Sequence, residues 1–161
     1  GGDDPVGTNF MISTSGTHVD ANVENTVYAI LGLRLKSTHI GKLTEIISTS
    51  VFCGTANDYA ECILLFNPTV AGTFTYNGIT NSALECAKGT AANTVSGGTQ
   101  IYGWHISSGA GEGGQHTPID NMLRLGSSIA GVCDTFVLAV RPINGSANLD
   151  VEGIINWREY L

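Results

Sequence analysis

A chain of 161 residues is long enough to bury one sizeable hydrophobic core, and charged residues make up only 13% of it. Its net charge is −7, from seven basic and fourteen acidic residues, and no cluster of Lys or Arg occurs. A nucleic-acid binder needs a basic surface to displace counterions from phosphates, and an anionic membrane surface attracts basic segments in the same way. The sequence therefore predicts a globular protein that binds neither nucleic acid nor membranes.

The surface residues available to this chain favour strands and turns over helices. Gly, Thr, Ser and Asn are abundant, whereas the strong helix formers Lys, Glu and Arg are scarce. No apolar run approaches the length of a membrane-spanning helix, so no membrane anchor is expected. The composition predicts an all-β protein.

The first 26 residues contain no sustained periodicity. Polar residues and glycines surround one short apolar patch, made of Phe10, Met11 and Ile12. Such a segment is typical of an extended arm that packs along its own domain or reaches onto a neighbour. We therefore expect an N-terminal anchoring arm over residues 1–26 and a β-sandwich domain over residues 27–161.

The clearest structural signal is the pair of predicted strands at residues 134–143 and 149–157. Side chains alternate across a strand, so a period of two gives one buried face and one solvated face. In the second strand the apolar face carries Leu149, Val151, Ile155 and Trp157, and in the first it carries Phe136, Leu138 and Val140. The five-residue link between the strands has turn chemistry, which favours an antiparallel hairpin.

Further strands are expected along the rest of the chain. Residues 27–36 alternate with Ala29, Leu31, Leu33 and Leu35 on the inner face, and residues 43–53 and 59–66 suggest a second hairpin. The dipeptide Asn77-Gly78 predicts a tight turn between residues 72–76 and 79–87. Residues 99–106 form one more predicted strand, and residues 117–125 form either a strand or a short helical turn. Eight to nine short strands predict a jelly-roll-like β-sandwich.

The four cysteines indicate a reducing compartment. They are Cys53, Cys62, Cys86 and Cys133, with no CxxC pair and no histidine at metal-ligand spacing. Several lie in or beside apolar runs, where a free thiol behaves as a small hydrophobe. We expect buried, reduced thiols and folding in a cytoplasm, and a Cys53–Cys62 bridge is the disulfide that remains open.

No motif in the sequence predicts catalysis, a metal or a cofactor. The glycines of residues 107–114 lack the Lys-Ser/Thr of a phosphate-binding loop, so a surface loop is the better interpretation. The four histidines match no zinc motif. Asp134 and Asp150 beside the C-terminal strands suit calcium binding, but turn capping explains them equally well. The chain is therefore expected not to be an enzyme.

Exposed aromatic rings could form a platform for sugars. The candidates for such a surface are Tyr102, Trp104 and Tyr160. The alternative is core packing, because Trp104 lies on a predicted strand face with other hydrophobic residues.

Several segments resemble a family of β-rich structural domains in tailed-phage virion proteins, of the head-decoration or fibre-tip type. The segments are LLFNPTVAGTFTY (64–76), ANTVSGGT (92–99), LRLGS (123–127), VLAVRP (137–142) and GIINWRE (153–159). The resemblance covers residues 33–161, and none of its motifs is catalytic.

The resemblance implies a bacteriophage virion structural protein that is displayed on the virion surface. The expected role is a capsid decoration or head-appendage protein that binds the major capsid protein, or other virion proteins, through its N-terminal arm. Closed cyclic symmetry is usual for such oligomers, so a homotrimer is expected. The alternative is a fibre-tip domain that recognises a host-surface glycan.

Overall fold

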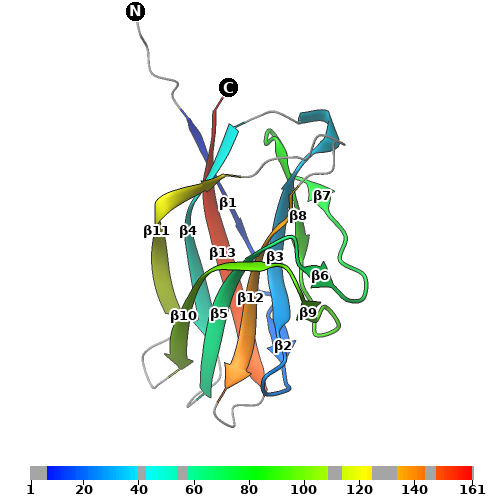
Figure 1. The fold of residues 1–161 in the computed structure, drawn as a ribbon, viewed down its shortest axis with the longest axis vertical. Helices are drawn as coiled ribbons and strands as arrows, with labels where there is room; N and C mark the ends of the chain where they lie inside the picture. Colours follow the sequence, from blue (N-terminus) through cyan, green and yellow to red (C-terminus); the bar gives the residue numbers. More distant parts are fainter. Residues whose placement is uncertain are drawn as a thin grey trace, which may run out of the picture.

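Two antiparallel β-sheets pack face to face in the computed structural model of the chain (Figure 1). The structure describes residues 7–39, 43–53, 58–108, 114–124, 134–143 and 148–160, and it gives only the backbone for residues 43, 58, 108 and 114–124. Apart from the short 3-10 helix η1 (Ser37–His39), the regular elements of this described part are all strands. The prediction of an all-β sandwich is confirmed.

The first sheet, called sheet A, has the order β1-β13-β4-β11. β1 and β2 pair with the same edge of β13, β1 along its C-terminal half and β2 at its N-terminal end. The strands of sheet A are β1 (Thr8–Ser13), β2 (Val19–Ala21), β4 (Leu43–Cys53), β11 (Gly114–Arg124) and β13 (Leu149–Tyr160). Sheet B has the order β10-β5-β12-β3-β8-β7. Its strands are β3 (Tyr28–Leu35), β5 (Asp58–Phe66), β7 (Asn77–Gly78), β8 (Leu84–Lys88), β10 (Thr99–Ser108) and β12 (Phe136–Ile143). The short strands β6 (Thr69–Val70) and β9 (Val95–Ser96) pair with each other.

The eight long strands follow jelly-roll connectivity. Numbered along the chain as β1, β3, β4, β5, β10, β11, β12 and β13, they take the order 1-8-3-6 in sheet A and 5-4-7-2 in sheet B. Consecutive strands therefore cross between the sheets everywhere except from β5 to β10. This is the double Greek-key arrangement of a jelly roll.

Both predicted hairpins are wrong for the same topological reason. β12 lies in sheet B and pairs with β3 and β5, whereas β13 lies in sheet A and pairs with β4. Likewise β4 and β5 belong to opposite sheets. In both cases the chain passes from one sheet to the other between the two strands. Turn residues permit a reversal of the chain, but they do not determine whether the next strand pairs with the last or packs across from it.

The described part of the N-terminal segment belongs to the sandwich. β1 pairs with the C-terminal half of β13, from Thr8↔Glu159 to Ser13↔Ile154, and β2 pairs with its N-terminal end. Val19 and Ala21 are buried. Of the two expected arrangements for the arm, the packing along its own domain is the one observed, and the boundary at residue 26 does not separate two structural units.

The C-terminal strand β13 lies at the centre of sheet A and supplies much of the core. Its apolar side chains are buried as predicted, and the largest of them, Trp157, is 0% exposed. The ring of Phe10 stacks on Trp157 with a centroid separation of 5.8 Å. Trp157 Nε1 donates to Glu159 Oε2 at 2.7 Å, and Glu159 Oε1 accepts from the Ala83 amide at 2.7 Å. Trp157 thus connects β13 to β1 through Phe10, and to the turn before β8 through Glu159.

A bulge shifts the pattern of β3. The register with β12 moves from Leu31↔Leu138 to Ala29↔Ala139, which leaves Ile30 as the extra residue. Ile30 and Leu31 therefore both contact the main core, while Ala29 lies on the opposite side of the sheet. The prediction that Ala29 shares the inner face with the leucines is wrong, because the bulge reverses the alternation before it.

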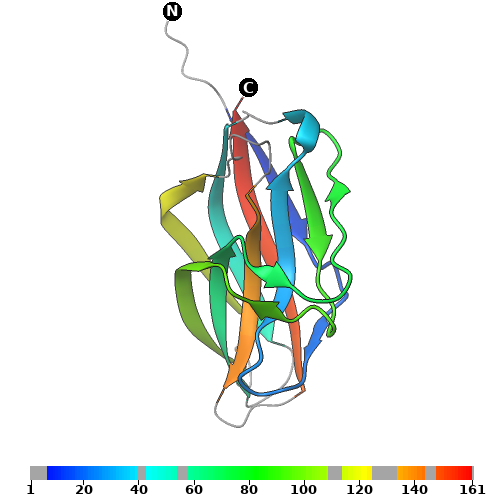
Figure 2. The ribbon, with the colours of Figure 1, turned by 45° about the vertical axis from the view of Figure 1, so that its right-hand side comes forward.

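The outer face of sheet B is covered by parts of the chain's own residues 67–98 that precede and follow β7 and β8, and these parts cross β3 and β12 (green in Figure 2). Val70, Phe74 and Val95 pack there against a second buried cluster, made of Ala29, Ile63, Leu65, Val137 and Ala139. The expected solvated face of β12 is consequently buried at Val137 and Ala139. The predicted turn at Asn77-Gly78 is wrong as well, because these residues form β7 and pair with β8.

One buried amide holds this covering segment in place. Asn93 is 0% exposed, and its Nδ2 donates to the carbonyls of Ala71 at 2.9 Å and Thr73 at 3.0 Å. Its Oδ1 accepts from the amide of Thr90 at 2.9 Å and from Thr90 Oγ1 at 3.0 Å. Its carbonyl accepts from the Ala29 amide of β3. The side chain of Asn93 uses both donors and accepts two bonds, so its burial carries little desolvation cost.

The covering segment also approaches β3 closely at Gly32. A Cβ atom at this position would lie 2.7 Å from both Phe74 Cε2 and Tyr76 Oη, so any other residue would displace these aromatic side chains. Arg34 lies 4.1 Å from the centroid of the Tyr76 ring and pairs with Glu85 at 2.5 Å. Burial raises the pKa of Tyr76 to about 12, although the Arg34 charge opposes this shift. Tyr76 is therefore a neutral packing residue under ordinary conditions.

Candidate functional site

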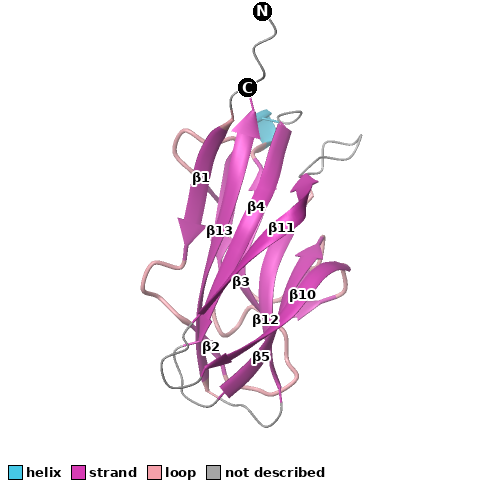
Figure 3. Ribbon diagram, turned by 90° about the vertical axis from the view of Figure 1, so that its left-hand side faces the viewer, coloured by secondary structure: helices cyan, strands magenta, loops and turns pink. Residues whose placement is uncertain are grey.

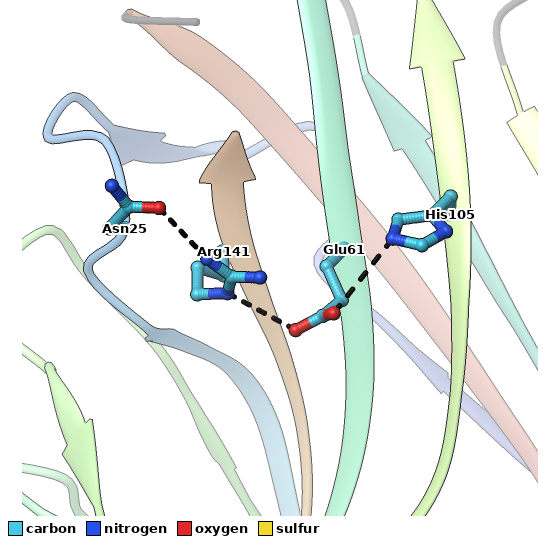
Figure 4. A network of polar contacts seen from close by, with 4 residues as sticks. All are labelled: Asn25, Glu61, His105 and Arg141. Atoms are coloured by element: carbon cyan, nitrogen blue, oxygen red, sulfur yellow. Dashed lines mark hydrogen bonds and ion pairs between the residues drawn. The ribbon is translucent and has the colours of Figure 1, made fainter. Parts of the chain in front are cut away.

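A polar cluster crosses three adjacent strands of sheet B, where residues 67–98 do not cover them. Glu61 of β5 is paired in register with His105 of β10 on one side and with Arg141 of β12 on the other. Paired residues in neighbouring strands point to the same face, so these three side chains lie in one row (Figure 4). Register alone brings together residues that lie far apart in the sequence.

The row is organised around the carboxylate of Glu61. Its Oε1 accepts from Arg141 Nε at 3.1 Å, and its Oε2 lies 3.9 Å from His105 Nε2. Arg141 Nη1 donates to Asn25 Oδ1 at 2.9 Å, and the amide of Asn25 donates to the carbonyl of Pro142. Arg141 and Glu61 are each 29% exposed, so their pairing mainly neutralises two half-buried charges.

An exposed tyrosine lies beside this row. Tyr59 is 48% exposed and stands two residues before Glu61 on β5, where it pairs with Ile143 and Ser107. An aromatic face next to charged and amide groups is chemistry that can hold a polar ligand such as a sugar. The sequence indicates that Tyr59 and Glu61 share one face of the strand, since they alternate with Ala60 and Cys62, which are buried.

The predicted aromatic candidates do not form one surface. Tyr102 and Trp104 are neighbours on β10 with ring centroids 5.9 Å apart, and Tyr102 is 43% exposed. Trp104 packs partly buried against the main core, and its Nε1 is buried without a hydrogen-bond partner. Tyr160 lies in the other sheet, where its hydroxyl donates to Glu45 Oε2 at 3.2 Å. The structure therefore joins two of the three candidates and separates the third.

The three residues of the expected anchor alternate across β1. Phe10 and Ile12 face the main core. Met11 points the other way, is 52% exposed and pairs with Asn156 of β13. Only Met11 is available on the surface to contact another molecule.

Met11 belongs to the outer face of sheet A, where no described segment lies in front of the strands (Figure 3). Phe52 of β4 is 46% exposed on the same face, opposite Glu152 of β13, and Ile154 is half-buried between Ser13 and Ser50. Phe52, Glu152 and Ile154 line a hollow of about 230 Å³, together with Ser13 and Ser50, and Met11 lies outside it. The outer faces of the two sheets thus differ: the chain covers much of one, and the other presents apolar side chains to solvent.

The described cysteines are unsuited to nucleophilic chemistry. Cys53, Cys62 and Cys86 are buried and form no disulfide with one another, which agrees with the prediction of reduced, buried thiols for these three. Burial raises the pKa of Cys62 well above its ordinary value and that of Cys86 above its ordinary value. Both thiols therefore stay protonated. Cys133 and most of the glycine-rich segment lie outside the described residues, and the description of His116 is limited to its backbone.

The chain has no close match among known proteins. No protein-family model matches the chain, and no curated protein matches it. A solved structure of infectious bursal disease virus Gx strain superposes with a TM-score of 0.13 at 10% identity, over 97% of this chain and 40% of that chain. The protein thus spans less than half of the length of the viral chain. A superposition with so low a TM-score does not show a shared fold. Within the described residues, no helix is long and apolar enough to cross a bilayer.

Proposed function

We propose that the chain is a structural protein of a bacteriophage virion, a capsid decoration or head-appendage protein that acts as a homotrimer. The observation that carries the proposal is the outer face of sheet A. A structural component must join copies of itself and bind a shell, and it needs an uncovered surface that can contact another copy to do so. Jelly rolls are common in viral shells, although a fold by itself does not fix a function.

The composition of this face supports self-association. Met11 of β1 and Phe52 of β4 are large, exposed side chains on this face. They lie on either side of β13, opposite Asn156 and Glu152, with Ile154 of β13 between those two positions. Exposed apolar side chains gathered on one face mark interaction surfaces, and Met and Phe are enriched in the cores of such interfaces. The surrounding Ser, Asn and Glu side chains supply a polar rim.

The anchoring mechanism differs from an exchanged arm. Residues 8–13 and 19–21 are already paired with β13, so they are not free to add a strand to a neighbouring subunit. We therefore assign the contact with the major capsid protein, or another virion protein, to the surface of the folded sandwich outside the face that joins the copies. Three buried cysteines that form no disulfide with one another fit a protein that folds in the reducing cytoplasm of a host before assembly on the virion surface.

A second candidate function is recognition of a host-surface glycan by a fibre-tip domain. The observation that favours it is Tyr59 beside the Glu61–Arg141 pair, because an exposed ring can stack on a sugar while the charged groups bind hydroxyls. This surface lies on sheet B, away from the face assigned to self-association.

Cosedimentation distinguishes the two functions. Labelled protein is mixed either with phage particles assembled without it or with host cells, and Tyr59→Ala serves as the matched variant. The proposal predicts saturable binding to particles that Tyr59→Ala leaves unchanged. Binding to cells only, lost in Tyr59→Ala, would establish the glycan function instead, and failure to bind particles would refute the structural role.

A further inference from the structure

We propose that His18, Asp20 and Asp150 form a binding site for a divalent transition-metal ion of the zinc type. The three residues lie where β2 meets the start of β13, at the opposite end of the sandwich from the two termini (Figure 1). The proposal does not depend on the virion function, because it rests on the geometry of these side chains alone.

The backbone positions the three side chains on one face. Asp20 pairs directly with Asp150 across the antiparallel ladder between β2 and β13. The residues that alternate with them, Val19, Ala21, Leu149 and Val151, are buried and fix both strands against the core. His18 comes two residues before Asp20 and therefore points to the same outer side. Paired strands therefore hold Asp20 and Asp150, and His18 directly precedes β2.

The distances between the donor atoms suit one shared ion. His18 Nε2 lies 2.9 Å from Asp20 Oδ1 and 3.5 Å from Asp150 Oδ1. All three ligand atoms lie within 4.8 Å of one another. Bonds of about 2.0–2.2 Å to a tetrahedral zinc ion place neighbouring ligand atoms roughly 3.3–3.5 Å apart. Small side-chain rotations bring these atoms to that spacing without any movement of the strands.

The charges at this position call for a cation. Two carboxylates directly opposite each other across a ladder repel and weaken the pairing of the strands. A divalent ion bound between them converts the repulsion into a cross-link that ties β2 to β13. All three side chains are about half-exposed, so an ion has access from solvent and water can complete its coordination.

The donor set selects the class of ion. One imidazole nitrogen and two carboxylate oxygens suit zinc and its neighbours, whereas calcium takes six to eight oxygens and Cu(I) prefers sulfur. The other described histidine beside an acid, His105, lacks this arrangement. Its partner Glu61 is already paired with Arg141, and the distance is 3.9 Å. His105 is therefore a matched control within the same chain.

Isothermal titration with Zn²⁺, and separately with Ca²⁺, tests the site on the full chain. The variants are His18→Gln and Asp150→Asn, with His105→Gln as control, and circular dichroism checks the fold of each. We expect one Zn²⁺ per chain, at least tenfold weaker binding in His18→Gln and Asp150→Asn, and no change in His105→Gln. A Zn²⁺-dependent rise in the thermal midpoint should vanish in the same two variants.

Cobalt supplies a second readout if a variant fails to fold. Co²⁺ added to the wild-type chain should give the visible absorption of a tetrahedral or five-coordinate site, and Zn²⁺ should displace it. The proposal is overturned if Zn²⁺ does not bind the wild-type chain, if binding persists in folded His18→Gln, or if Ca²⁺ binds as tightly as Zn²⁺.

Discussion

Replacement of Trp157 by alanine is expected to lower the free energy of unfolding by about 3–5 kcal/mol, the usual cost of truncating a large buried aromatic side chain. Trp157 is fully buried, stacks on Phe10 and donates a hydrogen bond to Glu159. The substitution leaves a cavity between the sheets and removes one of the donors that satisfy the Glu159 carboxylate. Since domains are stable by about 5–15 kcal/mol, Trp157→Ala removes a large share of the free energy of unfolding.

Trp104→Ala is the matched control for this result. Trp104 lies at the edge strand β10, is only partly buried and has an unpaired Nε1, so its truncation should cost about 1–2 kcal/mol. Urea denaturation followed by far-ultraviolet circular dichroism measures both variants. Equal losses from the two substitutions would show that Trp157 is not the centre of the core.

Deletion of residues 1–26 is expected to abolish stable folding. The deletion removes β1 and β2, and with them every described strand on that side of β13. It exposes one face of Trp157 and removes the buried side chains of Val19 and Ala21. Each buried aliphatic or aromatic side chain contributes about 1.5–3 kcal/mol, and the newly unpaired edge of β13 also favours aggregation.

A shorter deletion of residues 1–6 is the control, because it keeps both strands. Thermal unfolding and size-exclusion chromatography report on both truncations. If the chain without residues 1–26 unfolds at the same midpoint as the full chain, the N-terminal strands are dispensable and the assignment of residues 7–26 to the sandwich fold is wrong.

The sequence predicts strands well because the period-two pattern is local. In β13, Leu149, Val151 and Ile155 alternate with half-exposed polar residues, and the whole set lies as expected. The pairing of strands is not local. The link from β12 to β13 has the same turn residues whether it closes a hairpin or arches between sheets, so neither wrong hairpin could have been recognised from its turn.

The burial of β12 on both faces has a signal in the sequence that its period-two pattern does not convey. The unbroken apolar run from Phe136 to Val140 signals a strand that is covered on both sides, and residues 67–98 supply the second cover. The ligand-binding candidates could not be assembled from sequence in the same way. Glu61, His105 and Arg141 come together only through the register of three strands, and His18, Asp20 and Asp150 only through the pairing of β2 with β13.

The molar mass of the purified chain in solution tests the central claim, that the outer face of sheet A joins copies of this protein. Multi-angle light scattering should give three times the mass of one chain for the wild type and for Tyr59→Glu. Phe52→Glu should give a folded monomer, because it places a charge on the face that joins the copies. Tyr59→Glu is the matched control, because Tyr59 is exposed to a similar extent but lies on the other sheet. A monomeric wild type, or a Phe52→Glu variant that remains trimeric, would contradict the assignment of this face.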